Sequence, residues 1–165
     1  MTDDLRIRRA AETDDGQLAA IAYDTWSFET AVGPLPDAAA PFFDERPGVT
    51  VATTLVAFLP EAVAGYVAIS PGPDTSQSWT IHDIAVAPLL QGRGIGLALV
   101  RAAVAAAHSA GATEVGAQVP AGETAVGRLL LRTRFHTLTQ STRTGAGTSS
   151  GRTVMMMRSP LHRST

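Results

Sequence analysis

The segment from residue 84 to residue 99, IAVAPLLQGRGIGLAL, constrains the fold of this chain more than any other part of it. A short apolar run leads into Pro88, a glycine-rich stretch follows, and a long alanine-rich apolar segment begins after Gly96. This order predicts a buried strand that ends at Pro88 and a glycine loop that opens directly onto a helix. The first N–H groups of a helix have no helical partner and lie at the positive end of its dipole. Because glycines also let a ligand come close to the backbone, the junction is suited to bind a phosphate or a pyrophosphate.

The sequence excludes some of the sites that use such a loop. A P-loop requires GxxxxGK[ST], and the chain contains no lysine. A Rossmann fingerprint requires GxGxxG after the first strand of a βαβ unit, whereas this chain has GxGxG deep in the sequence. Arg93 lies inside the loop and adds a charged donor, which favours an anionic ligand. A tight strand-to-helix turn without any ligand remains the alternative.

Composition limits the class of protein. With 165 residues the chain is long enough for a core of its own, and we expect one domain over residues 1–165. A hydrophobic content of 45% with 17% charged residues is typical of a globular protein. The net charge of −2 predicts neither nucleic acid nor an anionic membrane as a partner. No apolar run is long enough to span a membrane and the start lacks a signal peptide, so we expect a cytoplasmic location.

The absence of cysteine excludes three kinds of chemistry: disulfides, thiolate metal sites and a covalent intermediate on a cysteine nucleophile. The histidines are not spaced as metal ligands. We therefore expect no metal site.

The hydrophobic pattern predicts strands and helices along the whole chain. Strands are expected at 5–8, 49–58, 63–70, 78–87, 114–119, 135–142 and 152–157. Helices are expected from residue 14 onward, at 94–110 and at 123–134, and the long proline-rich connection from residue 29 to residue 47 holds at most a short helix at 37–44. Asp14 and Gln17 predict a capping box for the first helix. Its apolar face is expected to comprise Leu18, Ile21, Ala22 and Trp26.

The spacing Val86-x-Pro88-x-x-Gln91-x-Arg93-Gly94-x-Gly96 resembles the acyl-CoA-binding motif of the GNAT-type (GCN5-related) N-acetyltransferases. The family pattern is V-x-P-x-x-Q/R-x-x-G-x-G/A, and the order of expected elements is also similar from residue 7 to about residue 158. The resemblance implies a single-domain α/β fold with a mixed, mostly antiparallel sheet of about seven strands flanked by about four helices. It implies acetyl-CoA as the acyl donor.

The resemblance also implies which residues hold acetyl-CoA. The loop would surround the pyrophosphate with its N–H groups, and the backbone of the preceding strand would pair with the pantetheine amides. The N–H group of Val86 would face the thioester oxygen. The implied cofactor-binding residues are Ile84, Ala85, Val86, Gln91, Gly92, Arg93, Gly94, Ile95, Gly96 and Leu97.

His82 is the first candidate for the catalytic base. Regular strand alternation places it with Ile84 and Val86 on the cofactor side, and Asp83 on the other side. Members of the resembled family often have His or Glu at this position, and a neutral imidazole can accept a proton at pH 7. A side chain that only lines the cleft is the alternative. Glu123 is the next candidate for the base.

The chain departs from the family pattern N-x-x-A-x-x-L-Y-x-x-x-G-F after the fifth strand. Aligned on Phe135, the Asn position is Glu123, the Tyr position is Leu130 and the Gly position is Arg134. That tyrosine often protonates the leaving thiolate, so the proton donor stays open. We predict acetyl transfer to a primary amine of a small molecule or peptide, by direct attack in a ternary complex. A non-catalytic GNAT-fold module that binds or senses acyl-CoA is the alternative, and a homodimer stays open.

Overall fold

The computed structural model describes residues 4–28, 41–43, 49–72, 77–120, 125–143 and 152–160. Its elements in chain order are β1 (Arg6–Arg9), η1 (Glu12–Asp14), α1 (Asp15–Phe28), β2 (Thr54–Leu59), β3 (Ala62–Pro71), β4 (Ser78–Val86), η2 (Pro88–Leu90), α2 (Ile95–Ser109), β5 (Glu114–Pro120), α3 (Ala125–Arg132), β6 (His136–Arg143) and β7 (Arg152–Pro160); η1 and η2 are short 3-10 helices. Seven strands form one sheet in the order β1-β2-β3-β4-β5-β7-β6. All neighbouring strands are antiparallel except β4 and β5. The predicted α/β class with a mixed, mostly antiparallel sheet is therefore confirmed.

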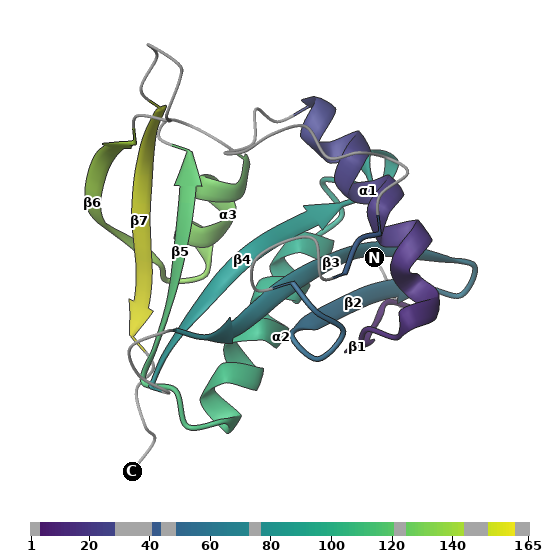
Figure 1. Cartoon of the computed structure of the whole chain (residues 1–165), viewed down its shortest axis with the longest axis horizontal. Coiled ribbons are helices and arrows are strands. Elements are labelled where there is room, and N and C mark those ends of the chain that lie inside the picture. Colours follow the sequence, from purple (N-terminus) through teal and green to yellow (C-terminus); the bar gives the residue numbers. More distant parts are fainter. Residues whose placement is uncertain are drawn as a thin grey trace.

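Helices pack against both faces of the sheet (Figure 1), so strand residues that alternate in direction are buried on both sides. On one face, here called the α2 face, Val67, Ile81 and Leu99 belong to a core cluster that α2 and α3 cover. On the opposite face, the α1 face, Leu18 and Tyr66 belong to a second cluster under α1. In the described part of the chain, no helix is long and apolar enough to cross a membrane.

The start of α1 differs from the predicted capping box. The carboxylate of Asp14 accepts the N–H of Ala11 at 2.8 Å and forms a bidentate ion pair with Arg8 at 2.7 and 2.9 Å. The side-chain carbonyl of Gln17 accepts the N–H of Val63 at 3.1 Å instead of reaching back to its own helix. The predicted capping box is wrong because both side chains make contacts outside the first turn of α1. The predicted apolar face is buried at residues 18, 21 and 22, and the side chain of residue 26 lies outside the described residues.

Residues 41–43 form a bend that α1 holds in place. Oδ1 of Asp15 accepts the N–H groups of Phe42 and Phe43 at 2.9 and 3.1 Å. The ring of Phe42 packs edge-on against Tyr66, with 4.7 Å between the centroids. The sequence allows at most a short helix over 37–44, and residues 41–43 are not helical. The rest of that range lies outside the described residues.

The helices α2 and α3 end with the same backbone motif. Gly111 and Arg134 adopt left-handed φ values of 91° and 68°. One residue later, the N–H groups of Ala112 and Phe135 donate to carbonyls five residues back, at 3.0 and 3.1 Å. This bond pattern is the Schellman motif, which requires a left-handed residue just beyond the helix. Arg134 therefore occupies a position that glycine would fill without strain.

The strands β4 and β5 pair over only part of their length. Their parallel ladder runs from Ser78 with Glu114 to Ile81 with Ala117. Beyond this point β4 continues along β3, while β5 continues along β7. The two strands diverge visibly toward the ends of their arrows (Figure 1). We call this opening the β4–β5 wedge.

Candidate functional site

The glycine loop joins the end of β4 to α2 as the sequence predicts. Gly92 and Gly94 have φ values of 76° and 84°, and a Cβ at either position would meet no other atom within 4 Å. The helix starts at Ile95, and the N–H of Ala98 donates to the carbonyl of Gly94 at 3.0 Å. The N–H groups before Ala98 therefore precede the first helical bond. Residues 91–94 are exposed, and no side chain covers the backbone at Gly92 and Gly94. An anion could therefore come close to the backbone of the loop.

The two polar side chains of the loop have different roles. Nε2 of Gln91 donates to the carbonyl of Val86 at 3.0 Å, which ties the loop to the end of β4. Arg93 is exposed and forms no ion pair with any residue that the structure describes. Its guanidinium is therefore free to bind an anion next to the N-terminus of α2.

Two of the predicted cofactor-binding residues are also needed for packing. Ile95 is buried in the cluster on the α2 face. A Cβ on Gly96 would lie 3.1 Å from Cδ2 of Leu129 in α3 and 3.7 Å from a methyl group of Val86. Both residues can thus offer a ligand only their backbone N–H groups. Leu97, the last predicted residue, is partly buried in the first turn of α2.

The backbone of β4 is open toward the wedge at alternate residues. The N–H of Ala87 donates to the carbonyl of Ala64 in β3 at 2.9 Å. Because antiparallel strands alternate bonded and non-bonded pairs, Ala85 also directs its backbone groups to β3. Ile84 and Val86 direct theirs to the other edge, where the ladder with β5 has ended. An extended ligand with amide groups could add to this edge as a short strand.

A β-bulge interrupts β4 at His82. Ala68 pairs with Asp83 and Ile69 pairs with Ile81, so His82 is an additional residue without a partner in β3. A bulge of this kind reverses the alternation of side chains beyond it. The structure accordingly places His82 and its neighbour Asp83 on the same face of the sheet.

Contacts on the α1 face confirm this arrangement. Nε2 of His82 lies 2.7 Å from Oγ of Ser70, and the hydroxyl of Tyr66 donates to Oδ2 of Asp83 at 2.8 Å. Ile84 and Val86 pack instead against the cluster on the α2 face. The prediction that His82 shares the side of Ile84 and Val86 is therefore wrong, and the bulge is the reason.

The surroundings of His82 favour its neutral form. Burial by neighbouring atoms lowers the pKa of its imidazole, and the negative charge of Asp83 opposes part of this shift. The side chain nevertheless stays exposed to solvent on the α1 face. A neutral, accessible imidazole can accept a proton. Sequence reasoning missed the contacts of His82 with Ser70 and of Asp83 with Tyr66, because they depend on the register of the bulged pair.

A model of the acetyltransferase (GNAT) family matches residues 9–132. The chain belongs to this family. No curated protein is similar enough to count as a match.

Solved GNAT structures share the fold over nearly the whole chain. The YncA protein of Salmonella typhimurium, solved with its cofactor acetyl-CoA, is 18% identical with a TM-score of 0.74, over 98% of this chain and 96% of that one. An N-acetyltransferase from Staphylococcus aureus Mu50 is 17% identical with a TM-score of 0.77, over 97% and 100%. A ribosomal-protein-alanine N-acetyltransferase from Brucella melitensis is 22% identical with a TM-score of 0.74, over 94% and 99%.

The GNAT tyrosine position is filled by a core residue in this chain. Leu130 is fully buried in α3 and belongs to the cluster on the α2 face. Its neighbour Leu129 is only partly buried and lies against Gly96 at the start of α2. The aligned position therefore presents no side chain to the wedge. Glu123, the second catalytic candidate, lies outside the described residues.

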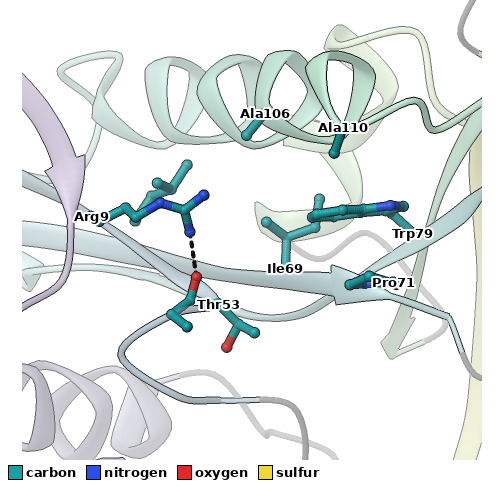
Figure 2. A pocket seen from close by; sticks show the side chains of 9 residues that line it. Arg9, Thr53, Ile69, Pro71, Trp79, Ala106 and Ala110 are labelled. Carbon is teal, nitrogen blue, oxygen red and sulfur yellow. Dashed lines mark hydrogen bonds between the residues drawn. The ribbon is translucent and has the colours of Figure 1, made fainter. Parts of the chain in front are cut away.

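A pocket of 270 Å³ lies near the C-terminal end of α2, at the opposite end of this helix from the glycine loop. Figure 2 shows Arg9 and Trp79 at its two ends, with Ile69 between them and the helix residues Ala106 and Ala110 above. Nη1 of Arg9 donates to the carbonyl of residue 52 at its floor. None of the predicted site residues lines this pocket.

Proposed function

We propose that this chain transfers an acetyl group from acetyl-CoA to a primary amine of a small molecule or peptide, by direct attack in a ternary complex. One observation carries the proposal: the backbone edge of Ile84 and the N–H of Val86, beyond the end of the β5 ladder, lead directly to the exposed glycine loop at the start of α2. The two features together match a ligand with amide groups at one end and a pyrophosphate at the other. Bound acetyl-CoA supplies an acetyl thioester, with the thiol of CoA as the leaving group.

The chain's residues divide the remaining work. The N–H groups of the loop and the guanidinium of Arg93 bind the pyrophosphate. The N–H of Val86, which points into the wedge, stabilises negative charge on the reacting carbonyl oxygen. His82 accepts a proton from the acceptor ammonium on the α1 face, so that the amine has a free lone pair. Asp83 stabilises the imidazolium that results.

Calorimetry with acetyl-CoA tests the donor site. Arg93→Ala should weaken binding by about 1–3 kcal/mol, as expected for the loss of charge-assisted hydrogen bonds. Arg101→Ala is the matched control, because Arg101 is exposed on α2 away from the loop and should leave affinity nearly unchanged. Equal affinities for all three proteins would contradict the assignment. Gly96→Val is a poor test, because its side chain would also collide with Leu129.

Thiol release from acetyl-CoA, measured against a panel of amines, amino acids, aminoglycosides and peptides, tests the transfer step. His82→Ala should lower turnover at pH 7 by about 100-fold or more, as is typical for the loss of a general base. Its affinity for acetyl-CoA should stay close to that of the wild type. If His82→Ala kept the wild-type rate between pH 6 and 9, His82 would only line the site, and Glu123 would be the next candidate for the catalytic base.

A second function follows from the burial of Leu130. Leu130, at the aligned position in α3, has no hydroxyl that could donate a proton to the thiolate. A module that binds acyl-CoA without turnover needs no such donor. Tight binding of acetyl-CoA with no thiol release across the amine panel would support this sensing function and exclude the enzyme.

A further inference from the structure

The hydroxyl of Ser70 lies between two groups that could receive its hydrogen. Its Oγ lies 2.7 Å from Nε2 of His82 and 3.4 Å from the carbonyl oxygen of Pro71. A serine hydroxyl has one hydrogen, whereas its oxygen can accept further bonds. Ser70 can therefore donate to only one of these two neighbours at a time.

The choice decides which nitrogen of His82 carries the proton. If Ser70 donates to His82, Nε2 is the acceptor and the neutral ring holds its hydrogen on Nδ1. The lone pair on Nε2 is then occupied, and the ring has no second lone pair for a substrate. If Ser70 donates to the carbonyl of Pro71, its oxygen accepts the Nε2–H of His82. Nδ1 then keeps a free lone pair.

We propose that Ser70 is a positioning residue that holds His82 in the Nε2–H tautomer, so that Nδ1 is the atom that takes the proton from the acceptor amine. The proposal rests on the proposed acetyl transfer for its substrate, but the tautomer itself can be observed without turnover. In the step, one N–H bond of the ammonium breaks and one N–H bond forms at Nδ1. The positive charge moves from the amine to the ring, and the proton passes to solvent after each transfer.

Neighbouring charge supports the same step. Asp83 follows His82 directly on the α1 face, and its negative charge favours the imidazolium. Tyr66 donates its hydroxyl hydrogen to Oδ2 of Asp83 at 2.8 Å, which fixes the direction of the carboxylate. Tyr66 is itself fully buried and packs against Phe42. The negative charge of Asp83 thus stabilises the imidazolium that forms when Nδ1 takes a proton, while Ser70 contacts Nε2.

Nitrogen-15 NMR of the histidine side chains tests the tautomer directly, with His82 assigned by its absence in His82→Ala. At a pH where the ring is neutral, wild-type His82 should show a protonated Nε2 and an unprotonated Nδ1. Ser70→Thr, which keeps the hydroxyl, should show the same pattern. Ser70→Ala should give a mixture of the two tautomers. Ser109→Ala is the matched control, because it removes an exposed hydroxyl at the far end of α2.

Turnover provides the second readout. Ser70→Ala should lower kcat by about 2- to 10-fold, as expected for one lost neutral hydrogen bond, with KM for acetyl-CoA unchanged. Ser70→Thr should restore most of that loss. A wild-type spectrum with a protonated Nδ1 would overturn the proposal whether or not the protein is active. A protonated Nε2 together with no turnover on any amine would leave the tautomer established and would reject the proposed function instead.

Discussion

Arg134 has a backbone conformation that is unfavourable for its type. Its φ of 68° lies in the left-handed region, where a residue with a Cβ loses about 1–2 kcal/mol relative to its normal conformation. Gly111 meets the same requirement at the end of α2 without that loss. The two helix ends share the same backbone motif, and the end of α3 is less favourable because its left-handed residue carries a side chain.

Arg134→Gly should therefore stabilise the protein. After subtraction of the greater entropy of glycine in the unfolded chain, the net gain should be about 0.5–1 kcal/mol. For a domain of this size, thermal unfolding should shift upward by roughly 1–4 °C. Gly111→Arg, the reverse change at the matching position, should lower the melting temperature. A lower melting temperature for Arg134→Gly would show that the arginine side chain stabilises the fold by more than the strain costs.

The ion pair of Asp14 predicts how stability depends on pH. Its hydrogen bonds to Arg8 lower the pKa of the carboxyl, with the backbone N–H of Ala11 adding to the effect and burial opposing it. Because the folded pKa lies below the unfolded one, the pair stabilises the protein above the unfolded pKa of about 3.9. That stability is lost as the pH falls through the folded value.

Asp14→Asn should isolate this contribution, since an amide oxygen can still accept the N–H of Ala11. In urea at pH 7 the variant should be less stable by about 1 kcal/mol, a modest value because the Arg8 side chain is 42% exposed. The difference from wild type should shrink toward zero as the pH falls below the unfolded pKa of about 3.9 and through the lower folded value. A difference that stays constant between pH 7 and pH 2.5 would show that geometry rather than charge is responsible.

Among the elements, β3 and β4 leave no room for a side chain at Gly65. A Cβ there would lie 2.5 Å from the carbonyl oxygen of Ala85, which belongs to the backbone and cannot rotate away. Gly65→Ala should therefore destabilise the protein by about 1–3 kcal/mol, as overpacking does in well-packed cores. The change would push β4 away from β3 at Val86, where β4 borders the wedge.

Gly16 offers a matched control for that substitution. It lies exposed in the first turn of α1, and a Cβ there would meet nothing within 4 Å. Gly16→Ala should raise stability by about 0.5–1 kcal/mol, because alanine is the better helix former. Chemical denaturation measures the free energy of unfolding of both variants. A similar change in both would mean that the close contact between β3 and β4 relaxes at little cost.

Most elements could be predicted because their signals are local. The strands and the helix after the glycine loop follow from hydrophobic periodicity and from Pro and Gly at their ends. The side of His82 could not be predicted, because the bulge depends on how β4 is paired with β3. The same pairing decides that Ala85 turns its backbone away from the wedge. The contacts of Ser70, Tyr66 and Asp14 also join residues whose proximity only the folded sheet creates.

At the scale of the whole molecule, the wedge predicts a pattern of hydrogen exchange. Saturating acetyl-CoA should slow exchange at the amides of Ile84 and Val86, because a bound ligand occupies the groups that β5 leaves free. ADP is the control ligand, since it carries a pyrophosphate without pantetheine and should protect only the loop from Gln91 to Leu97. Protection of the loop by acetyl-CoA with none at Ile84 and Val86 would show that the strand edge takes no part in binding.

The divergence of β4 and β5 also bears on aggregation. An open strand edge at the border of a sheet can serve as a template for another chain and lead to fibres. Here the open edge of β4 lies in the middle of the sheet. The ladder that stops at Ile81 closes one end of the gap. On its far side lies β5, which pairs with β7 over its whole length. A single extended molecule can enter such a gap, whereas a second folded sheet cannot align with it. The geometry that leaves hydrogen-bonding groups free for a ligand thus also shields them from other copies of the protein.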